Sequence, residues 1–149
     1  MEVYRITRAI YTNQLVASGG AARWNTRGRF VIYTAGSRPL ACLENVVHRS
    51  GEGLQELFRV MVINVPDTLP VDTITLVELP TDWADYQNYD ECQRRGEAWL
   101  SRGRSPVLCV PSAIVPQEWN YLINPAHPLF SQIDLVRTEA FAFDPRLKA

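Results

Sequence analysis

Short runs of β-branched and aromatic residues, each bounded by turn-forming residues, recur along the whole chain and constrain its fold most strongly. Runs of this kind between breakers are typical of β-strands. They predict strands at VYRI (3–6), FVIYT (30–34), LFRVMVINV (57–65), ITLVEL (74–79) and PVLCV (106–110), with a last one in the tail FSQIDLVRTEAFAF (130–143). The sequence therefore predicts a fold built mainly on β-sheet.

Helix signals occur in only two stretches. The first covers about residues 38–49, with Ser37 as its cap and Pro39 in its first turn. The second covers about residues 90–101 and is closed by Gly103. Because the strands are too many and the helices too few for regular βαβ alternation, a doubly wound sheet is disfavoured. We expect a mixed α/β fold of the α+β class.

The size and composition of the chain fit one globular unit. It has 149 residues, of which 46% are hydrophobic and 21% charged, and no internal linker interrupts it. We therefore expect a single compact domain over residues 1–149.

Signals for export, membrane insertion and metal binding are weak. The opening MEVYRITRAIY has charges beside short apolar pairs, unlike a secretory signal, and no stretch approaches the roughly 18 apolar residues of a membrane helix. We expect a cytoplasmic protein that does not contact membranes. The cysteines (Cys42, Cys92, Cys109) form no CxxC pair and the histidines (His48, His127) lack metal-ligand spacing, so neither disulfides nor a metal site are expected.

Charge is distributed unevenly along the chain. Residues 3–43 carry six arginines and no acid, a net charge of +6, whereas residues 44–149 carry −6. All basic residues except Lys148 are arginines, which favour two-pronged contacts to phosphate or carboxylate. Two interpretations remain open: the arginines bind an anionic ligand, or they pair with the acidic remainder. Direct binding of nucleic acid is disfavoured because no run of basic residues occurs.

The first predicted helix contains one polar residue in an unusual position. Glu44 falls within the apolar stripe that Leu40, Leu43 and Val47 form at helical spacing. A carboxylate there must be paired or must line a cavity, since an uncompensated buried charge is costly. We expect its partner to be one of the arginines of residues 3–43, either in a structural pair or in a functional cleft.

Two segments have the composition of functional loops. GGAARWNTRGRF (19–30) combines glycines, arginines, a tryptophan and an asparagine, which can bring backbone donors and guanidinium groups to a phosphate. VPSAIVPQEWNYLINPAHP (110–128) sets Ser112, Asn120, Asn124 and His127 among prolines and aromatic residues, and we expect a fixed loop.

Taken together, these segments resemble the RES domain, a family of bacterial toxins from toxin–antitoxin operons. The resemblance rests on VYRI, RWN(x)2G, Tyr33, the LE pair at 43–44, the PS pair at 111–112, NYLINP and HP, in the family's order and at its approximate spacing. It implies a fold similar to diphtheria-toxin-type ADP-ribosyltransferases, with central β-sheets. It also implies NAD+ as substrate with no separate cofactor, and a helix-turn-helix (Xre-type) antitoxin that blocks the cleft and alone contacts DNA. A homodimer is compatible with the sequence.

The resemblance also implies roles for individual residues. The predicted catalytic residues are Arg23, Tyr33 and Glu44. The predicted substrate-binding residues are Arg5, Trp24, Asn25, Arg27, Ser112, Asn120, Asn124 and His127.

These assignments are chemically reasonable. A carboxylate such as that of Glu44 can stabilise the oxocarbenium-like state formed when the nicotinamide–ribose bond breaks. Arg5 and Arg23 suit the pyrophosphate. Tyr33 could stack on the nicotinamide ring, and Ser112 could hydrogen-bond its amide or the ribose. Either hydrolysis or phosphorolysis of NAD+ would then follow.

Other functions are weighed against this one. The same chemistry could transfer ADP-ribose to a protein. A Ser112–His127 hydrolase is disfavoured, since no GxSxG elbow precedes the serine. A non-catalytic module that binds a partner in a repressor complex is the alternative from another class, and it should tolerate Glu44→Gln.

Overall fold

The computed structural model describes residues 1–48 and 57–147. Its helices are α1 (Arg38–His48) and α2 (Asp90–Arg102), with short 3-10 helices η1 (Ala9–Tyr11), η2 (Leu76–Glu78) and η3 (Pro128–Gln132). Its strands are β1 (Glu2–Arg8), β2 (Ile32–Ala35), β3 (Phe58–Asn64), β4 (Val71–Thr73), β5 (Val107–Pro111), β6 (Trp119–Ile123) and β7 (Asp134–Phe141).

The seven strands form one sheet in the order β4-β5-β6-β2-β1-β3-β7. Within the described ranges only β4 and β5 run parallel, and the other neighbours are antiparallel. The mixed α+β class is therefore confirmed, and the doubly wound alternative is excluded.

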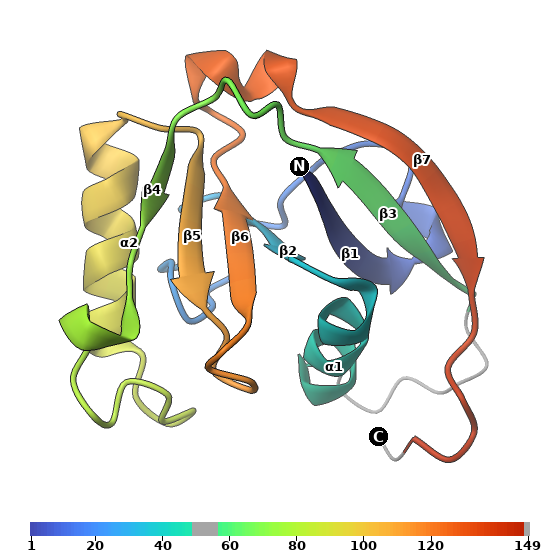
Figure 1. Cartoon of the computed structure of the whole chain (residues 1–149), viewed down its shortest axis with the longest axis horizontal. Coiled ribbons are helices and arrows are strands. Elements are labelled where there is room, and N and C mark those ends of the chain that lie inside the picture. The colour runs from blue at the N-terminus through green and yellow to red at the C-terminus, as the bar shows by residue number, and fades with distance from the viewer. Residues whose placement is uncertain (49–56, 148–149) are drawn as a thin grey trace.

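The sheet is weakly joined in its middle. β1 pairs with β3 over seven residues and β2 pairs with β6 over four, but β1 and β2 share only the pair Tyr4↔Ala35. The two strands diverge from this point in Figure 1, and α1 packs against both of them. The divergence leaves room for a cavity between the two halves of the sheet.

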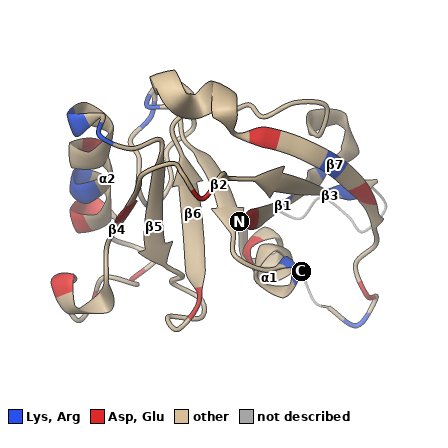
Figure 2. Ribbon diagram, turned by 45° about the horizontal axis from the view of Figure 1, so that its top comes forward, with Lys and Arg blue, Asp and Glu red and all other residues tan. Residues whose placement is uncertain are grey.

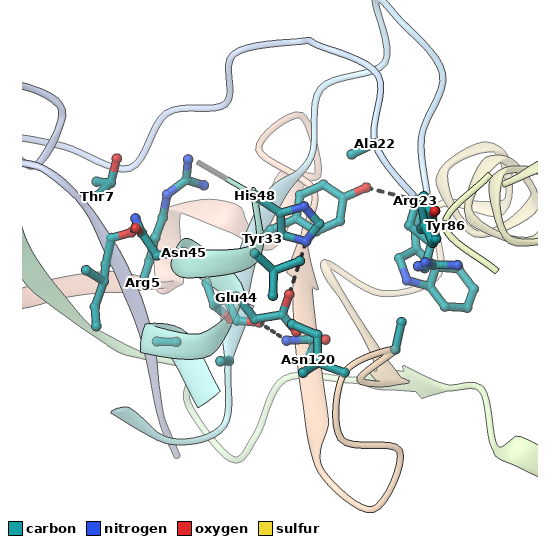
Figure 3. A pocket seen from close by; sticks show the side chains of 18 of the residues that line it. Arg5, Thr7, Ala22, Arg23, Tyr33, Glu44, Asn45, His48, Tyr86 and Asn120 are labelled. Atoms are coloured by element: carbon teal, nitrogen blue, oxygen red, sulfur yellow. Dashed lines mark hydrogen bonds and ion pairs between the residues drawn. The ribbon is translucent and has the colours of Figure 1, made fainter. Parts of the chain in front are cut away.

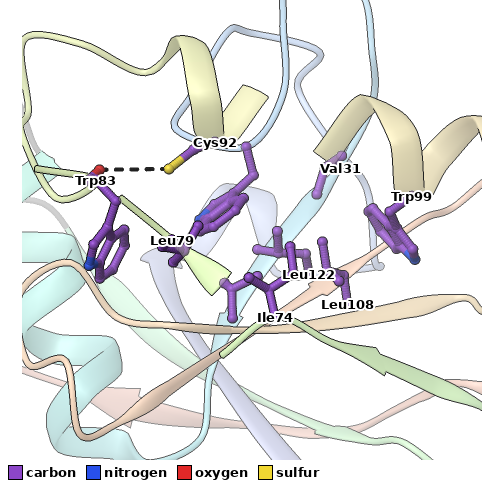
Figure 4. Packing of buried hydrophobic residues seen from close by; sticks show 10 residues of the cluster. Val31, Ile74, Leu79, Trp83, Cys92, Trp99, Leu108 and Leu122 are labelled. Carbon is purple, nitrogen blue, oxygen red and sulfur yellow. Dashed lines mark hydrogen bonds between the residues drawn. The ribbon is translucent and has the colours of Figure 1, made fainter. Parts of the chain in front are cut away.

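Three hydrophobic clusters hold the halves together. The first packs α2 and neighbouring loops on β5 and β6, and its tryptophans and leucines are drawn in Figure 4. The second covers the other sheet face with η3 and residues near Leu15. The third packs Leu40 and Ala41 of α1 on β1 and β3, together with Phe143.

The two predicted helices are confirmed. α1 begins after Ser37, whose Oγ accepts the Leu40 N–H at 3.2 Å, as expected of a cap. Its predicted last residue, Arg49, lies outside the described residues. α2 ends at Gly103, which has a φ of +62° and donates its N–H to the Trp99 carbonyl at 3.1 Å.

One strand prediction is wrong, and one strand was expected as a loop. Residues 74–79 contain η2 (Leu76–Glu78) instead of a strand, because Thr75 and Glu78 make a reciprocal capping box and Val77 is 94% exposed with no sheet face to cover. Residues 119–123, expected as part of a loop, form β6 between β2 and β5. Flanking prolines disguise this strand, although its backbone is paired on both sides.

The uneven charge of the sequence is partly neutralised in space. Arg38 pairs with Glu139 at 2.9 Å and Arg29 with Glu97 at 2.8 Å, so two arginines of the acid-free segment bind acids of the remainder. Figure 2 shows both signs interspersed on α2 and β7. Across the described residues, no helix combines the length and the hydropathy that crossing a bilayer would need.

Candidate functional site

A cavity of about 760 Å³ opens where β1 and β2 diverge. Its lining comes from β1, β2, α1, β6 and the loops at 21–24 and 84–89. Figure 3 shows Glu44 and Tyr33 in the middle, Arg5, Thr7 and Asn45 on one side, and Ala22, Arg23 and Tyr86 on the other. The volume is that of a site for a small organic ligand.

Glu44 of α1 lies at the centre of this cavity with its carboxylate held at both oxygens. Oε1 accepts a hydrogen bond from the Ser112 hydroxyl at 3.1 Å, and Oε2 lies 3.3 Å from His48 Nε2. The side chain is 24% exposed, so it remains accessible from the cavity. The arrangement presents a fixed carboxylate to a ligand.

The surroundings of Glu44 differ from the sequence expectation in two ways. Leu43 and Val47 are 38% and 57% exposed, so the buried face of α1 consists of Leu40 and Ala41 and the predicted apolar stripe is wrong. In the described part of the chain, the partners of Glu44 are a serine and a histidine and not an arginine. Both differences follow from the orientation of α1, which buries Leu40 and turns Glu44, Val47 and His48 to the cavity.

Ser112 lies just after β5 and is fully buried. Its hydroxyl donates to Glu44 and accepts the N–H groups of Ile114 and Val115, both at 3.1 Å. It does not line the cavity. The structure therefore gives Ser112 contact with Glu44 in place of the predicted position beside the ligand.

Arg5 reaches the cavity from β1. Within the described residues its guanidinium makes no hydrogen bond or ion pair, and burial lowers its pKa. Beside it, Asn45 donates to the Ile6 carbonyl at 2.9 Å, while its Oδ1 is buried and has no partner among these residues. Arg5 is thus a cation available to an anionic ligand.

Arg23 also lines the cavity but is engaged by the protein. Its Nη1 and Nη2 donate to the carbonyls of Trp83 and Ala84 at 2.8 and 3.2 Å. The guanidinium carbon lies 4.7 Å from the centre of the Tyr89 ring and 5.8 Å from that of Trp83. These contacts attach the loop at 23 to the segment 83–89.

Tyr33, Trp24 and Asn25 form a hydrogen-bonded unit in the cavity wall, where Tyr33 and Trp24 line the cavity and Asn25 does not. The Tyr33 hydroxyl accepts the Trp24 N–H at 3.1 Å and donates to Asn25 Oδ1, and burial raises the pKa of this tyrosine. Asn25 Nδ2 donates to the carbonyls of Gly20 and Arg29. Asn25 and Trp24 are 2% and 3% exposed, so both support the loop.

The other predicted binding residues divide between the cavity and distant positions. Asn120 lines the cavity and donates to the Thr34 carbonyl at 3.3 Å. Arg27 is exposed and outside the cavity. Asn124 and His127 are almost fully buried at the η3 end of the sheet, where both ring nitrogens of His127 bond backbone groups of Gly103 and Leu129. These last three residues are not brought to Glu44.

Several cavity residues were not identified from the sequence: Asn45, His48, Tyr86 and Tyr89. The spacing of His48, four residues after Glu44, was an available signal, because side chains four apart meet on a helix. Tyr86 and Tyr89 had no such signal, since they are brought in by the loop that follows η2.

Comparison with known proteins identifies the family of the chain. The family model described as "RES domain" matches residues 2–144. A "Prs ADP-ribosylating toxin" of Sphingobium sp. (strain YBL2) is 39% identical over 84% of this chain and 79% of that toxin's length. A "Toxin Res" of Yersinia enterocolitica is 35% identical over 99% of this chain and its entire length.

A solved structure has the same fold. The M. tuberculosis MbcT–MbcA toxin–antitoxin complex contains a chain that matches with a TM-score of 0.76 at 22% identity, over 95% of this chain and 84% of that one. The family model and these relatives show that the chain belongs to the RES domain family of toxins.

Proposed function

We propose that this RES-domain toxin depletes NAD+ by cleaving its nicotinamide–ribose bond. The observation that carries the proposal is the Glu44 carboxylate, fixed by Ser112 in the middle of a cavity whose one side holds Arg5, a cation with no partner among the described residues. NAD+ enters as the substrate, and the proposal requires no further cofactor or metal.

Glu44 would act on the sugar. When the bond between C1′ and the pyridinium nitrogen breaks, the electron pair leaves with neutral nicotinamide and positive charge develops on the ribose. A carboxylate preorganised near this charge stabilises the transition state, and it can also accept a hydrogen bond from a ribose hydroxyl. Because nicotinamide leaves as a neutral molecule, a second carboxylate acting as general acid is not needed.

Arg5 would bind the pyrophosphate. A partly buried guanidinium that has no partner in the described chain is suited to charge-assisted hydrogen bonds with phosphate oxygens. We expect Arg5→Ala to raise the KM for NAD+ much more than it lowers kcat. Asn120, which also lines the cavity, remains a proposed ligand contact.

The acceptor of ADP-ribose distinguishes two versions of this function. Water or phosphate would attack C1′ and lose its proton, giving ADP-ribose or its 1″-phosphate. Transfer to a protein is the second candidate, because a relative at 39% identity is named an ADP-ribosylating toxin. In each case the same bond of NAD+ breaks.

We further propose that an antitoxin regulates the toxin by covering the cavity. The structural neighbour is a toxin in complex with its antitoxin. The exposed residues Val47 and Tyr86 line the cavity and offer contact area to such a protein. A helix-turn-helix antitoxin would also account for any DNA binding by the complex.

Labelled NAD+ tests the acceptor. Purified toxin is incubated with NAD+ labelled in its adenine ring, with and without phosphate and with a cell extract depleted of small molecules. Soluble labelled ADP-ribose or its phosphate supports NAD+ depletion, and label bound to a protein band supports transfer. Intact NAD+ in all arms, from folded toxin free of antitoxin, would contradict both versions.

A further inference from the structure

Arg23 and the segment 83–89 form one unit at the side of the cavity opposite Arg5 (Figure 3). The two carbonyls that Arg23 binds belong to adjacent residues of this segment, Trp83 and Ala84. The Trp83 carbonyl also accepts a weak hydrogen bond from Cys92 of α2 at 3.7 Å. The segment is therefore attached both to the loop at 23 and to α2.

The surface that this unit gives the cavity is aromatic and apolar. Tyr86 is 76% exposed and lines the cavity together with Tyr89 and Ala84. Ala21 and Ala22 continue this surface. A large exposed aromatic side chain such as Tyr86 beside small residues suits the flat face of an aromatic ring.

The ends of the cavity thus differ in chemistry, with Glu44 between them. One end has Arg5, a cation without a partner in the described part of the chain, and the other has Tyr86 and Tyr89. NAD+ has a matching order: its pyrophosphate and its pyridine ring lie on opposite sides of the ribose whose bond is cleaved. With that ribose at Glu44 and the pyrophosphate at Arg5, the pyridine ring falls on the aromatic side.

We infer that the segment 83–89 forms the subsite for the pyridine ring, with Tyr86 as a specificity-determining contact and Arg23 as the positioning residue that holds the segment. This inference rests on the proposed function. It differs from the sequence expectation, in which Arg23 binds pyrophosphate, because both terminal nitrogens of Arg23 are engaged by backbone carbonyls.

The charge of Arg23 is consistent with this role. A fixed cation near the pyridinium favours the neutral leaving group, while Glu44 favours positive charge on the ribose. The positive charge of the substrate would therefore move away from Arg23 and toward Glu44 as the bond breaks.

Binding of the two halves of the substrate tests the inference without turnover. Affinities for nicotinamide and for ADP-ribose are measured separately, by NMR titration, for the wild type and for Tyr86→Ala, Tyr86→Phe, Arg23→Ala and Arg23→Lys. Tyr11→Ala is the matched control, since Tyr11 is 53% exposed and does not line the cavity.

We expect Tyr86→Ala to weaken nicotinamide binding by about threefold to tenfold, as the loss of one aromatic contact would, with ADP-ribose binding unchanged within about twofold. Tyr86→Phe should retain both affinities, because the ring is kept. Arg23→Ala should resemble Tyr86→Ala, and Arg23→Lys should recover part of the loss by donating to one carbonyl.

Several results would overturn the inference. If Arg23→Ala weakens ADP-ribose and spares nicotinamide, Arg23 is a pyrophosphate ligand. If Tyr86→Ala changes neither affinity, the aromatic side is not the subsite. Should the wild type bind neither compound, the proposed function fails and the inference fails with it. If the wild type binds both compounds and no variant weakens one affinity more than the other, only the inference fails. Tyr86 decides the matter even if Arg23→Ala does not fold.

Discussion

Ser112 shows how a single buried hydroxyl can organise a site that it does not enter. Its oxygen accepts two backbone N–H groups and donates its proton to Glu44, so the turn after β5 and the carboxylate on α1 are fixed by one atom. Because Ser112 is buried, these N–H groups depend on its oxygen, and an unsatisfied N–H inside a protein costs about 1–3 kcal/mol.

Removal of this hydroxyl should lower both stability and activity. We expect Ser112→Ala to destabilise the fold by about 1–3 kcal/mol and to reduce kcat about tenfold or more, with a smaller effect on KM, because Glu44 loses a donor that orients it. Urea denaturation and nicotinamide release measure the two effects.

A double-mutant cycle with Glu44→Gln is the control. If Ser112 acts through Glu44, adding Ser112→Ala to Glu44→Gln should lower kcat little further. Full additivity would contradict this.

The sequence indicated Glu44 for a partly mistaken reason. The apolar stripe that singled it out includes Leu43 and Val47, which are both exposed. Helical spacing could identify only that Glu44 lies on the same side of α1 as these residues. It could not show which side of α1 faces the sheet, because that depends on the packing of Leu40 and Ala41 against strands distant in sequence.

At the level of elements, α2 supports the site from outside the cavity. Gln93 Nε2 donates to the carbonyls of Ala22 and Asn25, and Gly96 lies directly against the Trp24 backbone. A Cβ placed on Gly96 would lie 1.8 Å from the Trp24 carbonyl oxygen. The helix can approach the 22–25 turn this closely only because residue 96 has no side chain.

Gly96→Ala should therefore displace the turn. We expect a loss of about 1–3 kcal/mol in the free energy of unfolding, even though alanine is the better helix former, because the methyl group collides with backbone that cannot rotate away. Thermal or urea denaturation measures the loss. Ser101→Ala, on the exposed surface of the same helix, should change stability by less than about 0.5 kcal/mol. Equal stability of Gly96→Ala and wild type would show that α2 and the turn are not in close contact.

Element prediction succeeded where local patterns are strong and failed where tertiary pairing decides. β3 and both helices follow from hydrophobic runs and caps. β6 was missed since its strand character depends on β2 and β5 on either side. Residues 74–79 were misassigned because the side-chain capping by Thr75 and Glu78 competes with strand formation.

For the whole molecule, the weak junction of β1 and β2 is the feature that creates the cavity. Hydrophobic clusters secure each half of the sheet, and α1 spans the divergence. Tyr121 of β6 lies near this junction, and burial raises its pKa to about 12. Burial raises the pKa of Tyr33 further. Both tyrosines are neutral in the folded protein at a pH where an unfolded chain would ionise.

Alkaline pH should consequently destabilise the fold. A raised tyrosine pKa contributes stability that is complete below the unfolded value of about 10 and is lost as the pH rises toward about 12. We expect the free energy of unfolding to fall across that interval, and Tyr121→Phe to make the fall shallower, because phenylalanine cannot ionise. Denaturation curves at fixed ionic strength from pH 9 to 12 test this. An unchanged slope in Tyr121→Phe would contradict it.

The central claim is that Glu44 catalyses cleavage of the nicotinamide–ribose bond, and the most direct test is nicotinamide release from NAD+ by purified, antitoxin-free toxin. Glu44→Gln preserves shape and hydrogen bonding but removes the charge, so it should lower kcat by at least about a hundredfold. Glu118→Gln, an exposed carboxylate outside the cavity, is the matched control and should behave as wild type. Release by Glu44→Gln at the wild-type rate, or no release by folded wild type, would contradict the account.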